Sequence, residues 1–319
     1  MIEKMPVMQF ISASWFKDVK KSSIWIAGYR MMLLTQAAFT QSPLIIDLDD
    51  VRAIFLYGKL SYMDSSNIFQ VGIDHAYNIN STKFESKETN IGSWTILITP
   101  YMSDGVQRSE PDTKNSIVVA EGILSALNSP NIVYQKIYEN IIDLSSSTTT
   151  AFSPIILNPG TNPPPNIKAS ALQLLSQSTV NLHALPENIQ NRVKLSLRWY
   201  SKSLIEVGID GFLSIWIALE VIGMPDTSNV RPAIDSLAKI YQLDLRTAVN
   251  RFQLGRIQDF RSKIVHEGQM FPIHFLLTKY LEAIYIDLLI ETLSLPRERR
   301  AEKVLTNPQF DLDGFLHRR

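Results

Sequence analysis

Arg261 and His266 are residues of this chain whose types suit acid–base chemistry on a bound phosphate group. They lie in the segment Asp259-Phe-Arg-Ser-Lys-Ile-Val-His-Glu-Gly268. Histidine titrates near neutral pH and can act as a base or an acid, and arginine stays charged and matches phosphate oxygens bidentately. RNA can be cleaved through its own 2′-OH without a metal. That reaction needs a base, an acid and a cation, and Ser262 could add a hydrogen bond to phosphate.

A single helix does not bring these two side chains together. Five residues along an α-helix advance about 500°, so Arg261 and His266 would point about 140° apart. They could converge if the helix frays before Gly268, or if two chains contribute to one cleft. Structural roles are also open: His266 could favour the dipole at a helix C-terminus, and Arg261 could pair with a neighbouring carboxylate on the surface.

Two further residues could support this pair. Glu220 ends an apolar run, so a buried Glu220 needs a partner, and an Arg261–Glu220 contact is one hypothesis. Arg246, Arg251, Arg256 and Arg261 recur every five residues, and each step turns about 140°, so they spiral around a helix. Arg246 and Arg251 are better interpreted as ordinary solvated arginines. Arg256 lies nearer the motif and stays a candidate for substrate binding.

Other kinds of site have little support in the sequence. The chain has no cysteine, which excludes disulfides, thiolate metal sites and cysteine nucleophiles. His75 and His183 are isolated, and no set of His, Asp and Glu has the spacing of a metal site. A Gly-rich phosphate loop is also missing. We therefore expect neither a metal nor a cofactor.

Charge and hydropathy limit the type of protein. The 319 residues have a formal net charge of zero, which argues against a protein that coats nucleic acid by bulk electrostatics. Residues 167–319 contain 19 basic and 16 acidic residues, so the small basic excess lies in the half with the motif. The most apolar windows, Ser23–Leu34 and Gly211–Met224, are shorter than the ~20 residues that span a membrane. No secretory signal is visible, and we expect a soluble, cytoplasmic protein without membrane contact.

The fold class expected is α+β, with a mixed α/β domain over residues 1–144 followed by an all-α bundle. Short β-branched and aromatic runs predict strands at Val51–Tyr57, Ile68–Ile73 and Ser93–Thr99. Helical spacing predicts helices at Ser116–Leu127 and Asn131–Leu144. Residues 145–166 are rich in Ser, Thr and Pro and are predicted to be a linker.

Residues 167–319 are predicted to be almost entirely helical. Asp210 is a plausible N-cap, and Gly268 should end the helix that contains the motif. Trp199, Tyr200, Phe212 and Trp216 are expected in the core. The apolar spacing and the breakers place the helices at Ile167–Gln177, Glu187–Val207, Gly211–Ile222, Arg231–Tyr241, Leu243–Arg251, Phe252–Val265 and Pro272–Leu293, with a short charged helix after Pro296.

Four segments of this half resemble the HEPN family, in its Apea-like branch, over roughly residues 177–293. They are Leu195-Ser-Leu-Arg-Trp-Tyr200, Asp210–Glu220, Asp259–Gly268 and the long closing helix. HEPN ribonucleases have an Arg, four to six residues and then a His, usually with a polar residue after the Arg. Arg261, Ser262 and His266 match this pattern, whereas Glu267 stands where many members have Gly.

The resemblance implies a function. HEPN domains dimerise and bring two motifs together, so two Arg261 and two His266 side chains would form one metal-independent endoribonuclease site. The family is also associated with toxins and anti-phage defence, with residues 1–144 then sensing or regulating. The expected partners are an RNA substrate and a second copy of the chain. Many HEPN domains are inactive, so the alternative is a non-catalytic module that binds RNA, a nucleotide or a protein. A DNA-directed nuclease on the same scaffold is a third option.

Overall fold

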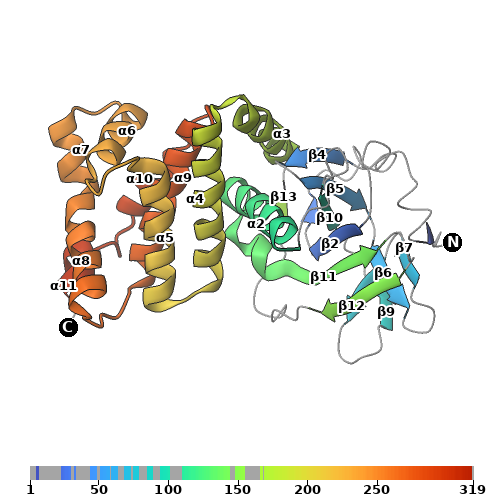
Figure 1. Ribbon diagram of the computed structural model, residues 1–319. Coiled ribbons are helices and arrows are strands. Elements are labelled where there is room, and N and C mark those ends of the chain that lie inside the picture. Colours follow the sequence, from blue (N-terminus) through green and yellow to red (C-terminus); the bar gives the residue numbers. More distant parts are fainter. Residues whose placement is uncertain are drawn as a thin grey trace. The chain divides into compact units, whose positions relative to one another are not determined.

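The structure is a computed structural model of the chain. It describes residues 5–6, 23–29, 32–33, 44–48, 51–57, 59–63, 68–72, 75–78, 85–88, 94–100, 110–143, 148–154, 166–167 and 169–317. Contacts within the chain divide it into two units, Met1–Thr179 and Val180–Arg319 (Figure 1). The division falls inside a helix, later than the linker predicted at residues 145–166. Each unit is described by itself.

The described part of the first unit consists mainly of antiparallel strands. Three three-stranded sheets have the orders β10-β5-β4, β12-β11-β2 and β1-β7-β6, and two pairs are β8-β9 and the parallel β13-β3. The elements are β1 (Met5–Pro6), β2 (Ser23–Tyr29), β3 (Met32–Leu33), β4 (Leu44–Leu48), β5 (Val51–Tyr57), β6 (Lys59–Met63), β7 (Ile68–Gly72), β8 (His75–Asn78), β9 (Glu85–Glu88), β10 (Trp94–Pro100), α2 (Glu110–Leu127), the 3₁₀-helix η3 (Pro130–Gln135), β11 (Lys136–Asp143), β12 (Thr148–Pro154) and β13 (Asn166–Ile167).

Two predictions for this unit are wrong. The helix expected at Asn131–Leu144 is instead η3 followed by strand β11, which pairs with β12 on one side and β2 on the other. The Ile and Tyr side chains of β11 suit a central strand, and the pairing with β2 joins residues more than a hundred positions apart. Part of the predicted linker is strand β12, so residues 145–166 are not all connecting chain. Strand β5 has the bounds that the sequence predicts.

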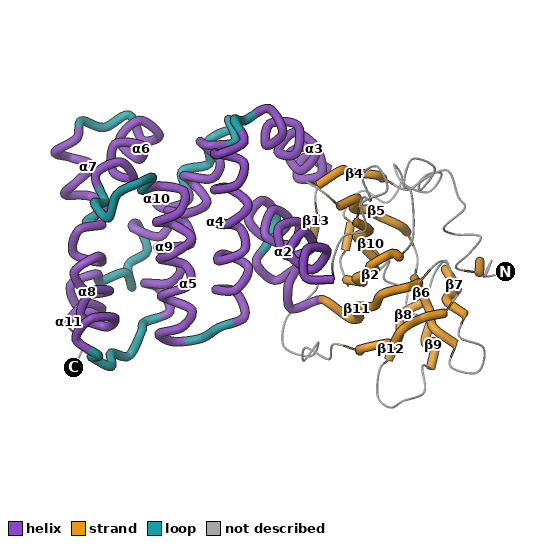
Figure 2. Tube along the Cα trace, in the orientation of Figure 1, coloured by secondary structure: helices purple, strands orange, loops and turns teal. Residues whose placement is uncertain are grey.

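Every element in the described part of the second unit is a helix, which confirms an all-helical C-terminal region (Figure 2). Helix α3 (Ala169–Ala184) crosses the boundary between the units. It is followed by α4 (Glu187–Ile205), α5 (Gly208–Gly223), α6 (Arg231–Tyr241), α7 (Leu245–Phe252), α8 (Leu254–Glu267), α9 (Phe275–Thr292), α10 (Arg300–Leu305) and α11 (Leu312–His317).

Local signals explain most of these boundaries. Asp244 caps α7 by accepting a hydrogen bond from the Thr247 N–H at 3.0 Å, and Gly268 ends α8 with a left-handed φ of 65°. Asp210 is not an N-cap, because α5 begins two residues earlier at Gly208. The last long helix begins at Phe275 rather than at Pro272, since His274 Nδ1 accepts from the Leu276 N–H at 3.3 Å.

Helix α9 forms the centre of the helical unit. Thirteen of the fifteen positions from Leu276 to Ile290 are buried, so its apolar side chains face the unit's own core. Helices α4 and α5 lie beside it (Figure 1), and Tyr200 of α4 stacks on Tyr285 of α9 with ring centroids 4.9 Å apart. Tyr200, Phe212 and Trp216 are fully buried, as predicted. Trp199 is only half-buried, and the Lys202 ammonium lies over its ring.

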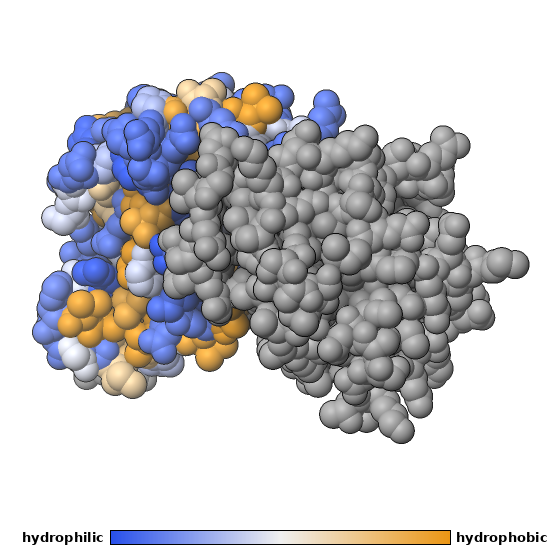
Figure 3. Space-filling view, turned by 45° about the vertical axis from the view of Figure 1, so that its right-hand side comes forward, coloured by the Kyte–Doolittle hydropathy of each residue, from blue (hydrophilic) through white to orange (hydrophobic). Residues whose placement is uncertain are grey.

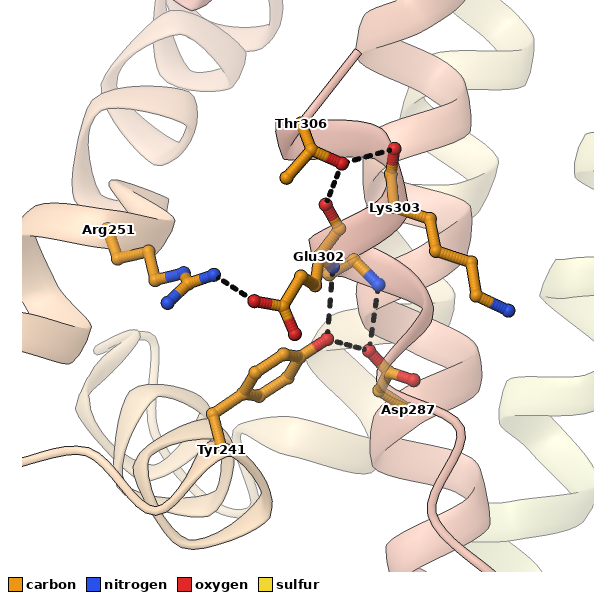
Figure 4. Close-up of polar contacts among 7 residues, drawn as sticks. Tyr241, Arg251, Asp287, Glu302, Lys303 and Thr306 are labelled. Atoms are coloured by element: carbon orange, nitrogen blue, oxygen red, sulfur yellow. Dashed lines mark hydrogen bonds and ion pairs between the residues drawn. The ribbon is translucent and has the colours of Figure 1, made fainter.

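A buried carboxylate links helices α6, α9 and α10 (Figure 4). Asp287 is 2% exposed and accepts hydrogen bonds from the Tyr241 hydroxyl at 2.6 Å and from the backbone N–H groups of Arg300 at 2.8 Å and Ala301 at 3.0 Å. The Tyr241 oxygen also accepts from the Glu302 N–H at 3.2 Å. The first N–H groups of a helix have no partner within it, so Asp287 and Tyr241 cap α10 from a distance.

Candidate functional site

Helix α8 carries the predicted motif and is fixed by its apolar face. The ring of Phe260 meets that of Phe212 on α5 edge-on, with centroids 5.6 Å apart, and it also lies 4.9 Å from the ring of Phe271. These contacts set the rotation of α8 about its axis, so they determine which side chains face α5 and which face solvent. The buried residues of α8 are Leu254, Ile257, Phe260 and Ile264.

Arg261 lies against α5, where it faces Glu220. Its Nη2 is 3.8 Å from Glu220 Oε2, and the two side chains are 23% and 30% exposed. The hypothesis of an Arg261–Glu220 contact within hydrogen-bond reach is therefore wrong, because this distance is too long for a hydrogen bond and the two charges form only an ion pair. The Nε of Arg261 is buried and has no hydrogen-bond partner. The buried Nε N–H is out of reach of solvent, so an incoming anion could use only the partly exposed terminal N–H groups of the guanidinium.

Glu220 is held by Trp216 on the same helix. The Trp216 indole N–H donates to Glu220 Oε1 at 2.6 Å, one helical turn away. The sequence analysis predicts only a core position for Trp216. Its position four residues before Glu220, one helical turn away, is the signal that points to this contact.

His266 lies in the last turn of α8 and is exposed. The helix continues through His266 to Glu267, so it does not fray in the way that could have brought His266 to Arg261. A regular helix leaves about 140° between the two side chains. The geometry of one chain therefore keeps the predicted acid–base group and the predicted cation apart.

The two remaining supporting candidates differ. Ser262 follows Arg261 on α8 and is half-buried. Arg256 forms an ion pair with Asp313 of α11, and its Nη1 donates to Gln253 Oε1 at 2.6 Å. Its charge is therefore already matched within the chain, which weakens the predicted role in substrate binding.

The end of α8 and the segment that follows it include one exposed acidic residue and three exposed apolar residues. Glu267 accepts a hydrogen bond from the Gln269 side chain at 2.7 Å. Val265, Met270 and Phe275 are 44%, 85% and 62% exposed. Figure 3 shows one face of the molecule, on which hydrophobic patches of the helical unit lie between hydrophilic residues. The end of the motif helix thus combines a titratable group with uncovered apolar surface.

The described part of the chain contains no group of three or more His, Cys, Asp or Glu residues that could hold a metal ion. Among the same residues, no helix is both long and apolar enough to cross a membrane.

Comparison with family models, with curated proteins and with solved structures gave no match for this chain. Function is therefore inferred from the motif helix and from the side chains packed around it.

Proposed function

We propose that this chain is a metal-independent endoribonuclease of the HEPN type, with Arg261 and His266 as its catalytic residues. The observation that carries the proposal is the exposure of these two side chains on α8. His266 is exposed, and the guanidinium of Arg261 is partly exposed and 3.8 Å from the carboxylate that faces it. A phosphate would give that guanidinium the anion that its loose contact with Glu220 only partly supplies.

The reaction proceeds through the RNA's own 2′-hydroxyl. One imidazole takes the proton of the 2′-OH, and the oxygen attacks the adjacent phosphorus. The bond from phosphorus to the 5′-oxygen breaks, and that oxygen leaves with a proton from a second acid. Arginine stabilises the extra negative charge on the phosphorane. The products are a 2′,3′-cyclic phosphate and a 5′-hydroxyl.

Two copies of the chain supply the groups that this reaction needs. One copy holds Arg261 and His266 about 140° apart, so a complete set of base, acid and cation requires a second α8. Exposed Val265, Met270 and Phe275 offer apolar surface for such a homodimer beside His266. In this proposal the enzyme acts in the cytoplasm as a toxin or an anti-phage effector, and the first unit senses its trigger or regulates it.

The second candidate is a non-catalytic helical module that binds RNA, a nucleotide or a protein. It is favoured by the local charge, because Arg251 and Arg256 are paired with Glu302 and Asp313 and because Glu267 adds a carboxylate next to His266. Such a surface attracts a polyanion weakly, which counts against rapid capture of RNA and, within this candidate, favours a protein partner.

A cleavage assay separates the two candidates. The purified full chain is incubated with mixed RNAs in EDTA, alongside His266→Ala and the control His317→Ala, which removes another exposed histidine on α11. The ribonuclease predicts cleavage by wild type and by the control, and loss of cleavage in His266→Ala. No cleavage together with measurable RNA binding favours the binding module. Cleavage that needs Mg²⁺, or that persists in His266→Ala, contradicts the proposed mechanism.

A further inference from the structure

Trp216 contributes more than apolar surface to the helical unit. It is fully buried, and a buried indole N–H requires an acceptor. The acceptor is the carboxylate of Glu220, at 2.6 Å and one turn along α5. The buried Trp216 ring therefore fixes one oxygen of the Glu220 side chain, which is 30% exposed.

The other oxygen of Glu220 is directed at the motif. It lies 3.8 Å from Arg261 Nη2, and no other ion pair of Arg261 occurs in the described part of the chain. Arginine has a long side chain with many rotamers, and a partly exposed guanidinium that lacks a fixed partner samples several of them. The packing of Phe212 against Phe260 keeps α5 and α8 at a set spacing, so the direction of the Glu220 carboxylate determines where the guanidinium rests.

We infer that Trp216 is a positioning residue for Arg261 and acts through Glu220. The indole N–H orients the carboxylate, and the carboxylate restricts the guanidinium to a position from which it can meet a phosphate. The inference rests on the proposed function for its consequence in catalysis, but the three-residue contact itself can be tested without RNA.

Two variants separate positioning from a purely structural role. Glu220→Gln keeps a carbonyl oxygen that can accept from the indole, so it preserves the packing of Trp216 and removes only the charge that faces Arg261. Trp216→Phe keeps an aromatic ring and removes the N–H donor. If Trp216→Phe does not fold, an unchanged Arg261 in Glu220→Gln still overturns the inference, because the carboxylate would then not restrict the guanidinium. The matched controls are Trp199→Phe, on α4, and Glu187→Gln, at the start of α4.

The first measurement is the rate at which phenylglyoxal modifies the Arg261 guanidinium, and peptide mass spectrometry quantifies the modified peptide over time. The rate at Arg231, which is 55% exposed and pairs with Asp235, serves as the internal reference. Loss of a partly exposed ion pair should raise the relative rate at Arg261 about two- to fivefold in both variants and in neither control. Equal relative rates in wild type and in both variants would overturn the inference, whatever the protein does to RNA.

The second measurement is steady-state cleavage of RNA. A misplaced catalytic cation should lower kcat about tenfold and leave KM nearly unchanged, because the lost contact is made in the transition state. A kcat equal to that of wild type in both variants would also overturn the inference. If wild type cleaves no RNA, the proposed function fails and the labelling rates alone decide the role of Trp216.

Discussion

Replacing Asp287 with alanine should destabilise the helical unit strongly. The carboxylate is 2% exposed and accepts three hydrogen bonds, from the Tyr241 hydroxyl and from the N–H groups of Arg300 and Ala301. A buried donor that loses its acceptor costs about 1–3 kcal/mol. The backbone N–H groups of α10 can regain some water, so we expect a loss of about 3–5 kcal/mol. A domain has only about 5–15 kcal/mol of stability in total.

Urea unfolding followed by tryptophan fluorescence measures this loss. The control is Asp235→Ala, which removes a carboxylate that is 47% exposed and pairs with Arg231 one turn away. Such a pair contributes less than about 1 kcal/mol. Amide hydrogen exchange should also accelerate at Arg300 and Ala301 in the Asp287 variant. A loss below about 1 kcal/mol, or unchanged exchange at these two amides, would refute the assignment of Asp287 as the remote cap of α10.

Three further outcomes follow from the helical unit. Gly268→Ala should cost about 1 kcal/mol of unfolding free energy, because an alanine is strained at a φ of 65° although its Cβ would meet no atom. Gly255→Ala lies in the first turn of α8, where a Cβ would also meet no atom, so it should raise the unfolding free energy by at most about 0.5 kcal/mol. A thermal midpoint of Gly255→Ala below that of Gly268→Ala would contradict this account. Expression of the wild type should be toxic and Arg261→Ala should relieve the toxicity; equal growth defects would count against a catalytic Arg261. Burial raises the pKa of Tyr200, Tyr241, Tyr280 and Tyr285 above the ordinary value of 10.0, so the folded chain keeps protons that the unfolded chain loses. The free energy of unfolding should therefore stay level below about pH 10 and fall as the pH rises above it. Urea midpoints measured between about pH 8 and 11 would show this fall.

Local signals in the sequence predicted the helical unit well. Helix α6 has the predicted bounds, because Pro232 lies in its first turn and the apolar positions repeat at helical spacing. Gly268 ends α8 as predicted, since its left-handed φ is rarely open to other residues. Both signals act within one or two turns of the chain, which is why sequence alone sufficed.

Long-range contacts account for the failures. The apolar residues of β11 fit either a helix or a strand, and pairing with β2 decided between them. The contact of Glu220 with Arg261 could be proposed because a carboxylate interrupts an apolar run. The ion pair of Arg256 with Asp313 could not, because nothing local in the sequence shows that α11 meets α8.

The most direct test of the proposed catalysis uses one RNA oligonucleotide and its copy with a single 2′-deoxy residue at the mapped cleavage position. Both are incubated with the full chain in EDTA, and the product ends are identified by mass spectrometry. The account predicts a 2′,3′-cyclic phosphate from the all-ribose strand, no cleavage at the 2′-deoxy position, and a rate at least about 100-fold lower in His266→Ala. Cleavage at the 2′-deoxy position, or a 5′-phosphate product, would contradict it.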